Sequence, residues 1–81
     1  MMVLVYPNPV VRELRITIPS SWQQSRVQFQ VAKQDGQVVL RWASANASQT
    51  EVADCTRLAP GIYFVSVSRG GEMMVQKVIK K

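Results

Sequence analysis

Apolar and polar side chains alternate with a period of two residues over much of this sequence. Residues 13–18 read Glu-Leu-Arg-Ile-Thr-Ile, so Leu14, Ile16 and Ile18 would share one face of an extended chain. Residues 26–31, Arg-Val-Gln-Phe-Gln-Val, alternate in the same way. This pattern predicts half-buried β-strands and argues against amphipathic helices, whose apolar positions recur every three or four residues.

Turn-forming residues separate these runs. Pro19 ends the first one, because proline has no N–H to donate to a sheet. Asp35-Gly36 and Gly70-Gly71 tolerate the positive φ angles of tight hairpins. Further strands are expected at residues 3–6, 37–42, 50–54, 61–67 and 72–80.

The same pattern predicts how these strands are oriented. Val38, Leu40 and Trp42 should share one face, and Val52 should point inward. Residues 61–67 are apolar on both faces at their start, which is typical of a central strand. Six to seven short strands with turns at intervals of roughly 8–12 residues predict an all-β antiparallel sandwich or barrel.

The composition argues against catalysis. The chain has 81 residues, enough for one domain, and its 47% hydrophobic content can fill one core but leaves little for a deep substrate cavity. It has no histidine, and its one cysteine, Cys55, excludes an internal disulfide or a cysteine zinc cluster. We therefore expect no enzyme activity, no metal and no cofactor, and we expect Cys55 to be buried as a small apolar side chain.

The net charge is +5, and the basic residues are spread along the chain apart from a cluster of lysines at residues 77–81. Such spacing favours solvated strand faces, with attraction to an anionic partner as the alternative. The basic residues do not interleave with aromatic ones on any predicted strand, so nucleic-acid binding is not expected. The apolar start, residues 1–6, is too short to span a membrane and lacks the basic start of a signal peptide.

Near the start, Tyr6-Pro7-Asn8-Pro9 should form a stiff, extended segment. Each proline fixes its own φ angle and restricts the residue before it. The segment can therefore not lengthen a central strand. It is either an edge turn where the chain enters the domain or a rigid, exposed recognition stretch.

A turn and a tyrosine form the second motif, Leu58-Ala59-Pro60-Gly61-Ile62-Tyr63. Gly61 can adopt backbone angles closed to other residues. Tyr63 can bury its ring and donate its hydroxyl to an upstream carbonyl, as in the tyrosine corner of immunoglobulin-type sandwiches. This favours a role in fixing the topology over a role in ligand binding.

The tail carries the third motif, Lys77-Val78-Ile79-Lys80. It is either a final strand whose lysines extend into solvent or an edge strand that a partner reads by adding a strand of its own. The same edge offers a route to a dimer of the isolated domain.

In this order, the motifs resemble the C-terminal sorting domain of the type IX secretion system of Bacteroidetes. The resemblance covers nearly the whole chain, with Asp35-Gly36 in a central hairpin. It implies an immunoglobulin-like antiparallel β-sandwich. It also implies that residues 1–81 are one domain, cut from the C-terminal end of a larger secreted protein.

The resemblance also implies a function. The cargo reaches the periplasm, the outer-membrane translocon recognises this domain, and a sortase-like cysteine peptidase at the cell surface removes it. Cleavage is expected in a linker before the fold, which these 81 residues either lack or retain only as Met2-Val3-Leu4. The implied recognition residues are those of the tail and opening motifs, and the implied structural residues are Gly61, Tyr63, Asp35 and Gly36.

An alternative is a carbohydrate-binding or adhesive immunoglobulin-like accessory module. Such modules display aromatic side chains on a planar platform. Phe29 and Tyr63 are expected in the core, which leaves Trp22 and Trp42 for a small patch. Trp42 is better explained as core or as the cover of a hairpin.

Overall fold

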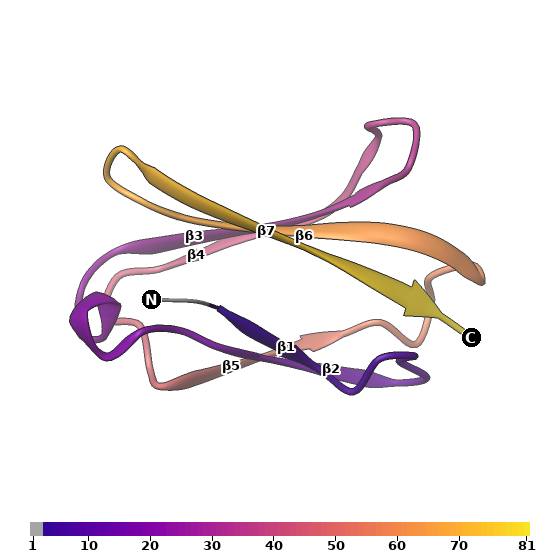
Figure 1. Cartoon of the computed structure of the whole chain (residues 1–81). Coiled ribbons are helices and arrows are strands. Elements are labelled where there is room, and N and C mark those ends of the chain that lie inside the picture. The colour runs from indigo at the N-terminus through magenta and orange to yellow at the C-terminus, as the bar shows by residue number, and fades with distance from the viewer. Residues whose placement is uncertain (1–2) are drawn as a thin grey trace.

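A computed structural model of the chain describes residues 3–81, so Met2 of the expected linker lies outside the described residues. The expectation is wrong for the other two residues, because Val3 is buried in the core and Leu4 begins the first strand. Seven strands form two antiparallel sheets stacked face to face (Figure 1). The smaller sheet has the order β1 (Leu4–Tyr6), β2 (Glu13–Thr17), β5 (Thr50–Asp54). The larger sheet has the order β4 (Val38–Ser44), β3 (Val27–Lys33), β6 (Gly61–Arg69), β7 (Glu72–Lys80). One turn of 3-10 helix, η1 (Ser20–Trp22), joins β2 to β3.

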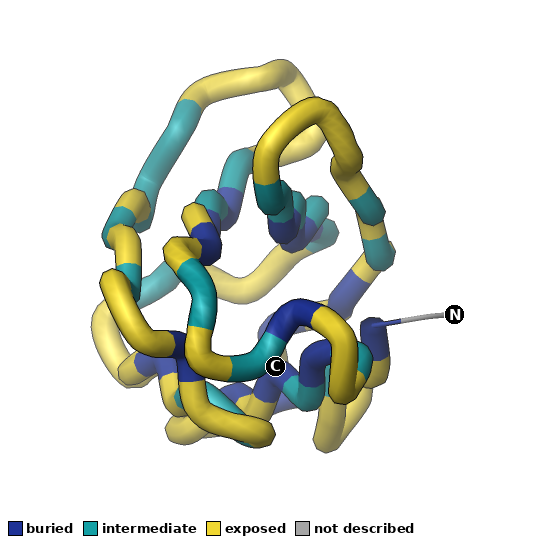
Figure 2. The backbone as a smooth tube through the Cα atoms, turned by 90° about the vertical axis from the view of Figure 1, so that its left-hand side faces the viewer, coloured by how far each residue is buried: buried dark blue, intermediate teal, exposed yellow. Residues whose placement is uncertain are grey.

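This architecture confirms the predicted all-β sandwich. The core lies between the sheets, where alternate residues of the facing strands are almost fully buried, and exposed positions concentrate at the turns (Figure 2). Burying one such aliphatic or aromatic side chain contributes about 1.5–3 kcal/mol. The core includes the predicted inward residues of β2 and β3, Ile18 just after β2, and the inward residues of β6: Leu14, Ile16, Ile18, Val27, Phe29, Val31, Tyr63, Val65 and Val67.

In β5 the predicted orientation is wrong. Val52 is 50% exposed, and Ala53 is the inward residue at 5%. The pairing with β2 explains this, because Ala53 is opposite the buried Leu14 and Val52 is opposite Arg15 on the outer face. Residues paired across a ladder share a face, so the phase of β5 is set by its neighbour and not by its own apolar residue.

In β4 the prediction holds for two of its three residues. Leu40 and Trp42 pack against the core. A register shift in the β3–β4 pairing makes Val38 the partner of Ala32, on the outer face, and Val39 packs against the core in its place. An irregularity of this kind reverses the alternation beyond it.

Two hairpin turns lie at the glycines where the sequence predicted them. Gly36 has a φ angle of 95°, and the Asp35 carboxylate accepts a hydrogen bond from the backbone N–H of Gln37 at 3.0 Å. Gly70 has a φ angle of 59° between β6 and β7. These angles are costly for residues with a Cβ atom. The second hairpin places β7 at the edge of the larger sheet beside β6.

Candidate functional site

The last strand, β7, combines an unshared sheet edge with contacts to the beginning of the chain. It pairs with β6 without a register shift, from Glu72 opposite Arg69 to Lys80 opposite Gly61. Figure 1 shows its end descending from the larger sheet towards the smaller one, where the opening segment lies. The tail and opening motifs, far apart in sequence, therefore meet in space.

Asn8 makes the first of these contacts. Its Nδ2 donates to the carbonyl oxygen of Lys77 at 3.2 Å, and its Oδ1 accepts from the backbone N–H of Ile79 at 2.9 Å. One amide side chain thus donates and accepts as the backbone of a neighbouring strand would. Pro9 follows Asn8 and has no N–H, so the side chain is the pairing group available here.

Val10 continues the contact with its backbone. Its N–H donates to the Ile79 carbonyl at 2.8 Å, and its carbonyl accepts from the Lys81 N–H at 2.9 Å. Val10 and Lys80 form an isolated parallel bridge. We call Asn8 and Val10 together the edge clamp. It occupies the outward backbone groups of β7 from the Lys77 carbonyl to the Lys81 N–H.

The remaining part of this edge, residues 72–76, is open. Backbone groups of successive residues in a strand point to opposite sides, and those of Ile79 point outward to the clamp. The N–H and C=O of Met73 and Val75 therefore point outward too, and no strand within residues 3–81 pairs with them. Their side chains are 65% and 49% exposed. We call residues 72–76 the open edge.

The four tail residues are divided between the two faces of β7. Lys77 and Ile79 are exposed on the outer face, whereas Val78 is buried in the core and Lys80 is only 7% exposed. The Lys80 Nζ donates to the Lys81 carbonyl at 3.0 Å. The interpretation of the tail lysines as solvent-exposed ends is therefore wrong for Lys80, because period-two alternation turns it inward with Val78.

The rest of the opening motif lies on the outside of the sandwich. Tyr6 is exposed, and its hydroxyl lies 3.3 Å from Thr17 Oγ1. Pro7 and Pro9 line a shallow hollow beside Arg12, and the peptide bonds before both prolines are cis. The sequence gives no signal that Asn8, between these prolines, is the residue that faces β7.

Tyr63 forms the expected corner at the start of β6. Its ring is buried, and its hydroxyl donates to the Ala59 carbonyl at 2.5 Å. Gly61 opens the strand with a φ angle of 156°, which residues with a Cβ atom rarely adopt, as expected for this glycine. The contact fixes the loop before β6 and leaves no face of the ring for a ligand.

The proposed aromatic patch of Trp22 and Trp42 is absent. Trp22 is fully buried in the core. Trp42 stacks on Phe29 with ring centroids 4.9 Å apart and an interplanar angle of 6°. An aromatic platform for sugars made from these two tryptophans is therefore excluded.

Other reactive groups are few. The Cys55 thiol is buried as expected, and burial, with a smaller effect of the Asp54 carboxylate, raises its pKa. A raised pKa keeps the thiol protonated and poorly nucleophilic. Within residues 3–81, no group of three His, Cys, Asp or Glu side chains could hold a metal, and no helix there could cross a bilayer.

Comparison with known proteins gives one result at the level of families. The model of the family described as "Secretion system C-terminal sorting domain" matches residues 4–81. The search of curated proteins gave no significant match. The matched region includes the edge clamp, the open edge and the tyrosine corner.

Proposed function

We propose that the outer-membrane translocon recognises this chain through the edge of its terminal strand. The chain belongs to the secretion system C-terminal sorting domain family. Members of this family are sorting signals of type IX secretion in Bacteroidetes. The domain is thus a substrate tag that interacts with the type IX machinery, and its protein is secreted or at the cell surface.

The observation that carries the proposal is the division of the β7 edge into a clamped end and an open part. An unpaired strand edge is a template for β-augmentation, in which main-chain hydrogen bonds give affinity and side chains give specificity. The open edge offers the N–H and C=O groups of Met73 and Val75, and both side chains are exposed. A translocon strand added here would be held over only a few residues, because the clamp blocks the rest.

Lys77 and Ile79 extend this surface on the outer face of β7. Both are exposed and point to the same side of the sheet as Met73 and Val75. Val78 and Lys80 act differently, since their side chains are buried and hold the end of the strand in place. In this proposal, Lys77 and Ile79 contact the partner, while Tyr6, Pro7, Asn8 and Pro9 position the strand that the partner reads.

The route of the protein follows from the same proposal. The cargo enters the periplasm, and after export a sortase-like cysteine peptidase cleaves before the fold, with residues 1–81 as the C-terminal domain of a larger protein. The domain is the substrate and not a catalyst. The lack of histidine and the burial of the Cys55 thiol support this reading.

The test is export of a cargo fusion that carries Val75→Pro. Proline removes the outward N–H of Val75 without removing a β6–β7 hydrogen bond, and edge strands tolerate it at such positions. We expect the fusion to accumulate in the periplasm, whereas the matched control Val75→Ile, which keeps both the N–H and an apolar side chain, should reach the surface. Fractionation and immunoblotting measure the distribution, and circular dichroism shows that both variants fold.

Export of folded Val75→Pro at the level of Val75→Ile would refute recognition through the open edge. Deletion of residues 77–81 should also block export. That deletion, however, removes Val78 from the core and the partners of the edge clamp, so it cannot separate recognition from folding.

A further inference from the structure

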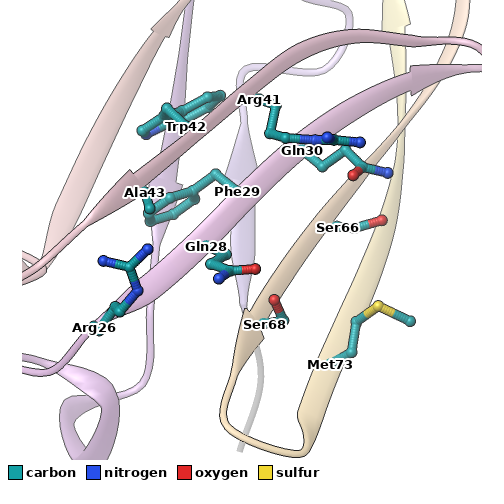
Figure 3. Close-up of a pocket in the computed structure, with 10 residues that line it drawn as sticks. All are labelled: Arg26, Gln28, Phe29, Gln30, Arg41, Trp42, Ala43, Ser66, Ser68 and Met73. Carbon is teal, nitrogen blue, oxygen red and sulfur yellow. The ribbon is translucent and has the colours of Figure 1, made fainter.

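The outer face of the larger sheet is hollowed above β3, β4 and β6. A hollow of about 430 Å³ has Arg41 and Gln30 side by side at one end and Met73 of β7 on its rim (Figure 3). A second hollow of about 300 Å³ continues it towards Gly70. No carboxylate lines either hollow. We call the two hollows together the polar trough, and its polar side chains are Arg26, Gln28, Gln30, Arg41, Ser66 and Ser68.

These six side chains have unused hydrogen-bonding capacity. None of them forms a side-chain hydrogen bond or an ion pair with another residue in the described part of the chain. The nearby Arg69 differs, because it bonds Ser25 and Glu72. Arg26 and Arg41 therefore contribute two positive charges that no protein group balances.

We propose that the polar trough binds an anionic oligosaccharide that carries carboxylate groups. The planar guanidinium of arginine matches a carboxylate with two parallel hydrogen bonds. Serine hydroxyls and glutamine amides both donate and accept, as the hydroxyls of a sugar require. Arg26 lies immediately before β3, about 13 Å along an extended chain from Gln30, and Arg41 is opposite Gln30. The two charges thus suit an elongated ligand with more than one acidic unit.

The location of the trough argues against a peptide as its ligand. It lies on the face of the sheet, where the backbone groups of β3 are used in pairing with β4 and β6. A peptide gains its affinity for a sheet from free backbone groups at an edge. A ligand on this face is met by side chains alone, and these are rich in hydroxyl, amide and guanidinium groups. This binding is separate from the sorting function proposed for β7.

The experiment is a calorimetric titration of the domain with an oligogalacturonate, a chain of uronic acids, at low salt. The double variant Arg26→Gln with Arg41→Gln should bind the oligogalacturonate about tenfold more weakly or worse. Loss of one hydrogen bond to a charged group alone raises the dissociation constant by about tenfold. The matched control is Arg12→Gln with Arg57→Gln, two exposed arginines outside the trough. It has the same net charge and should change the affinity by less than about twofold.

A second readout locates the ligand. In NMR spectra, the side-chain amide signals of Gln28 and Gln30 should shift during the titration, and that of the exposed Gln34 in the hairpin should not. Absence of binding by the unaltered domain, an equal loss in both double variants, or equally tight binding of a poly-glutamate peptide would each overturn the proposal, the last in favour of an acidic peptide.

Discussion

At the scale of single residues, a few polar groups decide how the ends of the sandwich are held. Tyr63 joins β6 to the loop before it, and Asn8 joins the opening segment to β7. Neither contact belongs to the regular pairing of strands. Tyr63 satisfies one backbone carbonyl, whereas Asn8 satisfies both a carbonyl and an N–H of β7.

Replacement of Tyr63 by phenylalanine tests the corner. The ring stays in the core, but the hydroxyl no longer donates to the Ala59 carbonyl. We expect the free energy of unfolding to fall by about 1 kcal/mol, the usual net value of one hydrogen bond. Urea unfolding followed by tryptophan fluorescence measures it. Tyr6→Phe is the control, since its hydroxyl contact is long and exposed, and an equal loss in both variants would contradict this role.

At the scale of elements, β7 is both an edge strand and a protected one. Proteins shield strand edges because free backbone groups invite unwanted pairing. Here the edge clamp covers the end of β7 and leaves the open edge exposed. Dimerisation of the isolated domain through this edge stays a prediction, and the same groups would serve it.

Replacement of Asn8 by alanine tests the clamp. The change removes the acceptor for the Ile79 N–H and the donor to the Lys77 carbonyl. We expect exchange of the Ile79 amide hydrogen to accelerate about tenfold or more, because local opening then costs less. Amides of β7 that bond to β6 should keep their protection. Asn46→Ala, at an exposed turn, is the matched control. An unchanged exchange rate of the Ile79 amide in Asn8→Ala would show that the Asn8 side chain does not stabilise this end of β7.

At the scale of the whole molecule, two small sheets share a single core, and segments from both ends of the chain close it. Val10 and Val78 are buried, and Cys55 is almost inaccessible beside them in the same apolar cluster. The buried apolar residues form one cluster shared by both sheets, so Cys55 has no separate core of its own. Access to the Cys55 thiol should therefore report opening of the sandwich as a unit.

The rate of thiol labelling measures the accessibility of Cys55 and so tests this prediction. At neutral pH a disulfide reagent should modify Cys55 at a rate that follows global unfolding as urea increases. Burial raises the thiol pKa in the folded state, so its contribution to stability is complete below the ordinary thiol pKa and is lost as the pH rises through the raised value. Cys55→Ala should flatten this pH dependence. Labelling of the native domain at the rate of a free thiol would contradict the prediction.

The alternation of side chains determined the core faces of β2 and β3, and glycine and proline determined the turns, because strand period and turn geometry are local properties of a sequence. The family resemblance, read from the same residues, is confirmed by the family match. The sequence identified the opening and tail motifs, but it did not predict that Asn8 contacts β7.

Tertiary structure decided the rest. In β5, Ala53 and not the predicted Val52 faces the core, because the register with β2 sets which side chains of β5 point inward. In β4, Val39 and not the predicted Val38 faces the core, because the β3–β4 pairing is irregular. Asn8 met β7 across 69 residues because folding brought both to the same edge. Pairing between distant strands depends on which edges remain free once the sheets are assembled, and no local pattern of side chains encodes that.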